Sequence, residues 1–135
     1  MQRLTDALDF QTQALVLRAE RQRLIASNIA NADTPGYVAR DMDFASALRE
    51  ATGQASAAAV KTTRAGHIPV AGGARGEAQL LYTRPAQNNL DGNSVDMDRE
   101  RAAFADNTVK YEATLRFING TVRTMLDAMK SHNQA

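Results

Sequence analysis

The sequence predicts a fold dominated by α-helices, in which two long helices flank a largely irregular middle segment. Three observations lead to this prediction: helical periodicity near the N-terminus, a heptad repeat near the C-terminus, and a long stretch of turn-forming residues between them. With 135 residues and no internal repeat, the chain has the length of one domain.

The first predicted helix runs from about Asp6 to Ala32. Thr5 is suited to cap its start, and Asp6 would lie at the positive end of the helix dipole. Pro35 disfavours the α conformation at Thr34, so the helix is expected to end before it. The apolar residues form two stripes, which are Leu4, Leu8, Leu15, Ile25 and Ile29, and then Phe10, Leu17 and Leu24.

A heptad repeat predicts the second helix, which extends to about Lys130. Asp96 is suited to cap its start, with Asp98 and Glu100 in the first turn. Gly120 costs about 1 kcal/mol in a helix interior, and a close helix crossing would explain its presence. One row repeats every seven residues, and a second row, which includes Arg101 and Thr108, follows it by four. The predicted apolar seam is Met97, Phe104, Tyr111, Leu115, Ile118, Val122, Met125 and Met129, with the tightest packing expected from Leu115 onward.

The segment between the helices, residues 36–94, shows no sustained period. Its only strand-like run is "AQLLY", so a short strand or hairpin is allowed there. Compact domains rarely contain such long irregular stretches. We therefore expect this segment to order on something else or to be mobile in the free chain.

Composition excludes several classes of function. The chain has no Cys, which rules out disulfides, thiol chemistry and Cys-ligated zinc. Its net charge of +1 provides no strong field for nucleic acid or an anionic membrane. The first ten residues, "MQRLTDALDF", contain no apolar core of a signal peptide, and no apolar run approaches the roughly 18 residues of a membrane helix. We expect neither a cleaved signal nor membrane insertion.

Few residues could carry chemistry. His67 and His132 are isolated from each other and from other metal-ligand patterns. Two "DMD" pairs, Asp41–Asp43 and Asp96–Asp98, lack further ligands, and helix capping explains the second pair. The glycine-rich run Ala71–Gly76 lacks the spacing and the Lys of a phosphate-binding loop. The sequence therefore predicts no catalytic residues, no cofactor and no metal, so we expect a protein that is not an enzyme.

The end of the first helix, "IASNIANADTPGY", is unusual because it contains amides where a single glycine would suffice. Side-chain amides near a helix end can meet the last free carbonyls, the departing backbone or another subunit. A C-cap role explains Asn31 but not Asn28, which lies too far inside the helix. The signature residues are Ser27, Asn28, Ile29, Ala30, Asn31, Thr34, Pro35, Gly36 and Tyr37.

The stretch "SNIANADTPGY" is similar to the signature near the N-terminus of bacterial flagellar axial proteins, which include rod, hook and hook-associated subunits. Two further stretches, "ARDMDFASAL" and "LDGNSVDMDRERAAFADNTVKYEATLRFING", resemble the B-type proximal rod subunits of the basal body. The resemblance covers both predicted helices and weakens across Gly53–Ala86.

The resemblance implies that the terminal helices pack as an antiparallel coiled coil. Residues 1–35 and 95–132 would then form one coiled-coil domain, joined by residues 36–94. It also implies helical assembly with other rod subunits into a hollow shaft that crosses the periplasm and transmits torque. The implied partners are copies of the chain itself, other rod subunits, the rod-base adaptor, the membrane-ring proteins, and the flagellar type III export apparatus, which does not cleave its substrates.

The residues alone leave a second hypothesis open. A coiled-coil adaptor or export-chaperone-like protein could bind one partner through the heptad face from Met97 to Met129. The two hypotheses differ in stoichiometry, because a shaft subunit forms an open helical array and an adaptor forms a small closed complex.

Overall fold

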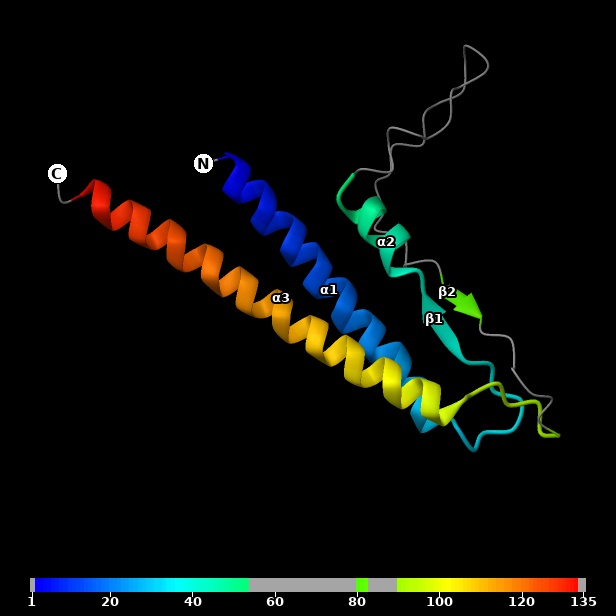
Figure 1. Cartoon of the computed structure of the whole chain (residues 1–135). Helices are drawn as coiled ribbons and strands as arrows, with labels where there is room; N and C mark the ends of the chain where they lie inside the picture. The colour runs from blue at the N-terminus through cyan, green and yellow to red at the C-terminus, as the bar shows by residue number, and fades with distance from the viewer. Residues whose placement is uncertain (1, 54–79, 83–89, 134–135) are drawn as a thin grey trace, which may run out of the picture.

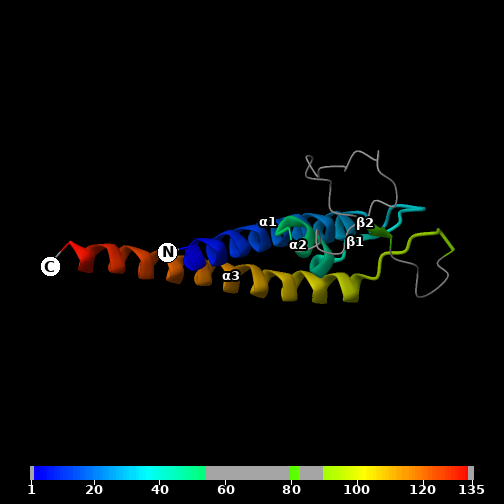
Figure 2. The same ribbon diagram turned by 90° about the horizontal axis from the view of Figure 1, so that it is seen from above.

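The structure, a computed structural model, describes residues 2–53, 80–82 and 90–133. It contains α1 (Gln2–Ala30), β1 (Arg40–Met42), α2 (Phe44–Ala51), β2 (Leu80–Tyr82) and α3 (Met97–His132). The helices α1 and α3 lie side by side and antiparallel, with both chain termini at one end of the pair (Figure 1). The end of α3 extends past the start of α1 (Figure 2). The predicted helical fold with paired terminal helices is confirmed.

The two long helices begin and end close to the predicted residues, with one exception. The helix α1 begins at Gln2, so the prediction of Thr5 as its N-cap is wrong. Asp96 caps α3 as predicted, because its carboxylate accepts hydrogen bonds from the N–H groups of Asp98 and Arg99. Local capping chemistry therefore identified the start of the second helix but not that of the first.

The connecting segment contains more regular structure than the sequence predicted. Asp43 caps the short helix α2 by accepting hydrogen bonds from the N–H and the hydroxyl of Ser46. The strands β1 and β2 pair antiparallel, with Arg40 opposite Tyr82 and Met42 opposite Leu80. The predicted strand in "AQLLY" is thus confirmed, whereas α2 was missed because eight residues are too few for a clear helical period. Residues 54–79 and 83–89 lie outside the described part of the chain.

A small apolar core lies between α1 and the β1–α2 unit. The Arg18 guanidinium of α1 stacks 4.0 Å from the centre of the Phe44 ring. An ion pair of 3.3 Å joins Arg21 of α1 to Asp41 of β1. The core consists of Leu17, Met42 and Ala47, with Leu24, Phe44 and Leu48 packed against them.

The seam between α1 and α3 has a polar centre. The side chain of Asn107 is completely buried, and its Nδ2 donates to the Arg18 carbonyl at 2.9 Å and to Gln22 Oε1 at 2.7 Å. The amide of Gln22 in turn donates to the Thr108 hydroxyl at 2.9 Å. A buried amide of this kind favours one alignment of two paired helices, because any shift leaves it without partners.

The rotation of α3 differs from the predicted one. In the structure, the residues three positions after each member of the first row face α1, and these residues are polar. The sequence predicted that the residues four positions after each member would face α1 instead. Leu115, Val122 and Met129, which were expected in the seam, are exposed. The prediction failed because Asn107 is completely buried in the seam, whereas Thr108 is only half-buried and contacts Gln22 of α1 through its hydroxyl. In the first row Met97, Tyr111, Ile118 and Met125 are half-buried and Phe104 is exposed, and the inward polar row is Glu100, Asn107, Thr114 and Thr121.

Gly120 is also explained differently from the prediction. Within the described part of the chain, a Cβ at Gly120 would meet no neighbouring atom within 4 Å. The close crossing that was expected between α1 and α3 is therefore absent at this position. No contact among the described residues explains a glycine in the middle of α3.

Candidate assembly site at the signature turn

Asn28 joins the end of α1 to the start of β1. Its side chain is only 1% exposed. The amide Nδ2 donates to the Arg40 carbonyl at 2.7 Å, and Oδ1 accepts from the Arg40 N–H at 3.0 Å and from the Tyr37 hydroxyl at 3.2 Å. The side chain therefore pairs with the departing backbone, one of the two roles expected for the signature amides. Because it is buried, Asn28 is not free to reach another subunit.

Asn31 has the local role that its position predicted. Its Nδ2 donates to the Ser27 carbonyl at 2.8 Å, one of the last carbonyls of α1, and its Oδ1 accepts from the Thr34 hydroxyl at 3.1 Å. Gly36 has a φ of 73°, which a residue with a Cβ rarely adopts. The hydroxyls of Ser27 and Tyr37 lie 3.2 Å apart and close the base of the turn.

Asn93 completes the turn from the far half of the chain, and sequence reasoning missed it. Its Nδ2 lies 2.8–2.9 Å from the carbonyl oxygens of Asn31, Ala32 and Thr34. Beside it, the Gly36 N–H donates to the carbonyl of Asp91 at 2.8 Å. The only sequence signal was an Asn in the turn-forming run before α3, and nothing local indicates that its partners lie about sixty residues earlier.

Burial changes the acidity of one carboxyl beside this site. Glu100 is buried in the first turns of α3, and burial raises the pKa of its carboxyl above the ordinary value. The nearby Asn28 amide lowers this pKa in part, and the nearby charge of Asp41 raises it further. The Glu100 carboxyl therefore lies in the electrostatic environment of the signature turn.

The residues considered for catalysis or metal binding have structural roles where they are described. Asp41 pairs with Arg21, while Asp43 and Asp96 cap α2 and α3. His67 and the run Ala71–Gly76 lie outside the described residues. In residues 2–53, 80–82 and 90–133, no three His, Cys, Asp or Glu side chains are grouped so that they could hold a metal ion.

Comparison with known proteins identifies the family of this chain. Residues 8–37, which include the signature, match the family described as "Flagella basal body rod protein". The chain is 46% identical to the flagellar basal body rod protein FlgB of Proteus mirabilis over 96% of its own length and 98% of that protein. It is 47% identical to the proteins of the same name from Escherichia coli K12 and Salmonella typhimurium, in both cases over 98% of its own length and 99% of the relative.

The chain belongs to the flagellar basal body rod protein family. It is a structural subunit of the rod, and the adaptor or chaperone hypothesis is not supported. Its relatives are named as rod proteins and not as enzymes. In the described part of the chain, no helix is both long enough and apolar enough to span a membrane.

The signature of this rod subunit has an inner and an outer face. Asn28 is buried, and Ile29, Asn31 and Tyr37 are half-buried. The residues that remain exposed are Ser27, Ala30, Thr34, Pro35 and Gly36. Any contact of the signature with a neighbouring subunit would therefore be made by the small residues of the turn and by one flank of α1.

The rod subunit also exposes apolar residues along α3. Leu115, Val122, Leu126 and Met129 follow one another at spacings of seven, four and three, which places them on one face of the helix. A groove of about 310 Å³ between α1 and α3 is lined by Ala19, Gln22, Arg23, Ala26, Thr108 and Tyr111. We call these four exposed apolar residues, Leu115, Val122, Leu126 and Met129, the outer row.

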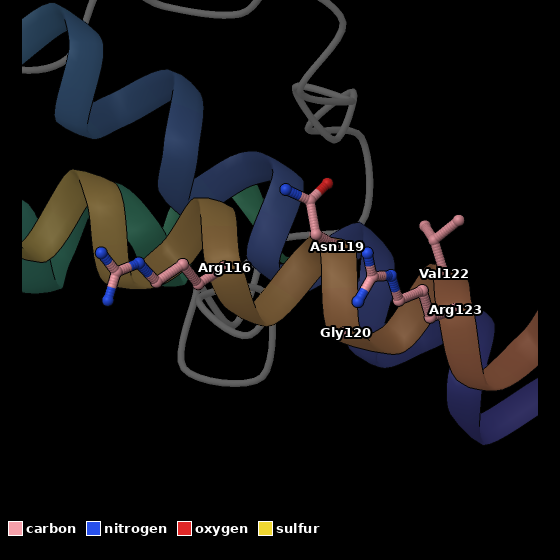
Figure 3. Close-up of a pocket in the computed structure, with 5 residues that line it drawn as sticks. All are labelled: Arg116, Asn119, Gly120, Val122 and Arg123. Carbon is pink, nitrogen blue, oxygen red and sulfur yellow. The ribbon is translucent and has the colours of Figure 1, made fainter.

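A hollow beside the outer row is formed by α3 alone. Arg116 and Arg123, one heptad apart, project from the helix on either side of Asn119 and Gly120, and Val122 stands beside them (Figure 3). The absence of a side chain at Gly120 makes the helix surface recede there. This stretch of α3 therefore combines an exposed apolar row with two cationic side chains and an accessible backbone.

Proposed function

We propose that this rod subunit assembles helically, with further copies of itself and with other rod subunits, into the hollow shaft that crosses the periplasm and transmits torque. At its proximal end the shaft meets the rod-base adaptor and the membrane-ring proteins. The flagellar type III apparatus exports the subunit without cleavage of a signal peptide. The chain itself does not insert into the membrane, binds no nucleic acid and needs no cofactor.

The outer row is the observation that carries this proposal. In α3 the polar row faces α1, the first apolar row is mostly half-buried, and the outer row faces solvent, whereas an isolated coiled coil buries both of its apolar rows in the seam. Burial of apolar surface is worth about 25 cal/mol per Å², so this face gains free energy when a neighbouring helix covers it. Residues 1–35 and 95–132, which contain α1 and α3, thus act as one assembly domain whose exposed apolar face is free to contact a neighbouring subunit.

Aspartate substitutions on α3 test the role of the outer row. Leu115→Asp combined with Val122→Asp should leave the isolated subunit folded, because both side chains are exposed, and should abolish its incorporation into rods. The matched control is Val109→Asp, an equally drastic change at an exposed position about 140° around the helix from Val122. Circular dichroism reports the fold, and motility with electron microscopy of basal bodies reports incorporation.

Equal loss of rods in the control and in the double variant would overturn the assignment to the outer row. Normal rods in the double variant would do the same.

A further inference from the structure

Two loops from opposite halves of the chain close on each other at the tip of the helix pair. Apart from the Asn93 amide, three contacts join the loop of residues 90–94 to the signature turn. The Gly36 N–H donates to the Asp91 carbonyl at 2.8 Å, and the Ser94 N–H donates to the Tyr37 carbonyl at 3.0 Å. The Ala39 N–H donates to the Ser94 hydroxyl at 2.8 Å.

The two loops also touch through their glycines. Gly92 has a φ of 72°, and a Cβ at this residue would lie 3.6 Å from Gly36 Cα. Both loops therefore bend back at glycine where they meet. The contact is a close approach of two backbones, and it is independent of the Asn93 side chain.

We propose that the signature turn is a composite site that Asn93 completes, and that Asn93 is the positioning residue for the exposed tip Thr34–Gly36. This inference rests on the proposed function, because it takes the tip as a surface that neighbouring subunits contact. Until the segment after residue 90 folds back onto the turn, the tip lacks the shape needed for assembly. Association is thereby limited to chains in which both halves have folded together.

The hydrogen bonds of Asn93 support this role. The carbonyls of Asn31, Ala32 and Thr34, which follow the end of α1, all point at one side-chain donor. Those of Asn31 and Thr34 also accept the N–H groups of Thr34 and Tyr37, so Asn93 adds a second hydrogen bond that ties the turn to the far half of the chain. That donor is the Nδ2 of a side chain only 2% exposed. Its orientation is set from the other side, because Asn93 Oδ1 accepts the Val95 N–H at 2.8 Å. The Asn93 side chain is therefore a hydrogen-bond donor held in a fixed orientation, and it does more than fill space.

Substitutions at Asn93 test whether its side chain acts as a hydrogen-bond donor or only fills space. Asn93→Asp keeps the size of the side chain and the acceptor for the Val95 N–H but places carboxylate oxygens against three carbonyls. Asn93→Ala removes the group. If Asn93 acts as a donor, the aspartate variant should be the more damaging of the two, whereas a space-filling role predicts the reverse. Asn133→Asp, at the exposed end of α3, is the control for added charge.

The measurement is amide hydrogen exchange in the isolated full-length subunit, followed by complementation of a strain that lacks it. Protection of the Gly36 and Ala39 amides should fall on the order of tenfold in Asn93→Ala and further in Asn93→Asp, with α3 amides and the Asn133→Asp control unchanged. Rods should be restored by the control and not by Asn93→Asp. Unchanged protection, or a milder effect of aspartate than of alanine, would overturn the proposal that Asn93 completes the signature turn.

Failure of this inference can be distinguished from failure of the proposed function. The exchange data concern the isolated subunit, and incorporation of the wild-type chain is scored in the same strain. If the turn opens in Asn93→Asp while rods still form normally, the positioning role in assembly is overturned although the rod function stands. If the wild-type chain itself forms no rods, it is the proposed function that fails.

Discussion

The side chain of Asn28 hydrogen-bonds both backbone polar groups of Arg40, the carbonyl at 2.7 Å and the N–H at 3.0 Å. The Asn28 side chain thus makes the two backbone hydrogen bonds that a neighbouring strand would otherwise make to Arg40, the first residue of β1. The signature turn is therefore held from within by a side chain for which the sequence left two roles open, a bond to the departing backbone or a contact with another subunit.

This pairing predicts that Asn28 is a stability residue. Asn28→Ala leaves the two part-buried backbone groups of Arg40 without this partner, so it should lower the free energy of unfolding by about 2–4 kcal/mol. Asn31→Ala, which loses local bonds at a half-exposed site, should cost about 0.5–1 kcal/mol. Urea unfolding followed by circular dichroism measures both. Similar midpoints for the two variants would contradict the assigned roles.

Glu100 predicts a pH-dependent difference in stability. Burial raises the pKa of this carboxyl in the folded chain, so its contribution to stability is fully present below the unfolded pKa and is lost as the pH rises through the folded value. Glu100→Gln removes this loss, and it should therefore stabilise the fold at pH 7 relative to the wild type.

The difference between wild type and Glu100→Gln should shrink as the pH falls through the folded pKa, and it should be lost below the unfolded pKa, where the carboxyl is protonated in both states. Thermal unfolding of both chains between pH 3 and pH 8 tests this. A stability difference that stays constant with pH would show that the Glu100 carboxyl is not perturbed by burial.

The same substitution should destabilise the fold to different extents in the two rows of α3. Ile118 is half-buried towards α1, so Ile118→Asp should lower the free energy of unfolding by about 2–3 kcal/mol and prevent incorporation indirectly. Val122 is exposed, so Val122→Asp should change it by less than about 1 kcal/mol. Chemical unfolding of the isolated chains decides this, and equal destabilisation would mean that Val122 lies in the seam after all.

Asn107 provides a fourth prediction. Asn107→Asp removes the donor to the Arg18 carbonyl and to Gln22, and buries a carboxylate at a position with no exposure. The free energy of unfolding should fall by about 3–5 kcal/mol at neutral pH. The matched control is Asn119→Asp, the same change at an exposed position of the same helix, which should cost less than about 0.5 kcal/mol.

Local cues in the sequence predicted a large part of this fold. The Asp96 cap is a contact between residues two or three apart, so the sequence around it was enough to predict it. The strand at Leu80–Tyr82 and the end of the first helix before Pro35 were predicted in the same way. The fold class followed from the lengths of the two periodic segments, which are the most reliable signals in a single sequence.

Features that depend on two distant segments were missed. A heptad repeat leaves two choices for its second row, three or four residues after the first, and the partner helix makes the choice through Asn107 and Gln22. The role of Asn93 depends on carbonyls that belong to the first half of the chain. The rotation of α3, and with it the outer row, could therefore be seen only once α1 and α3 were placed together.

The central claim, that this chain builds the rod, is tested most directly in a strain that lacks it. Swimming is scored first, and envelope fragments are then imaged by electron microscopy for membrane rings and rods. We expect loss of motility and membrane rings without a rod, with both defects reversed by the wild-type gene. Complete basal bodies and normal swimming in the deletion strain would contradict it.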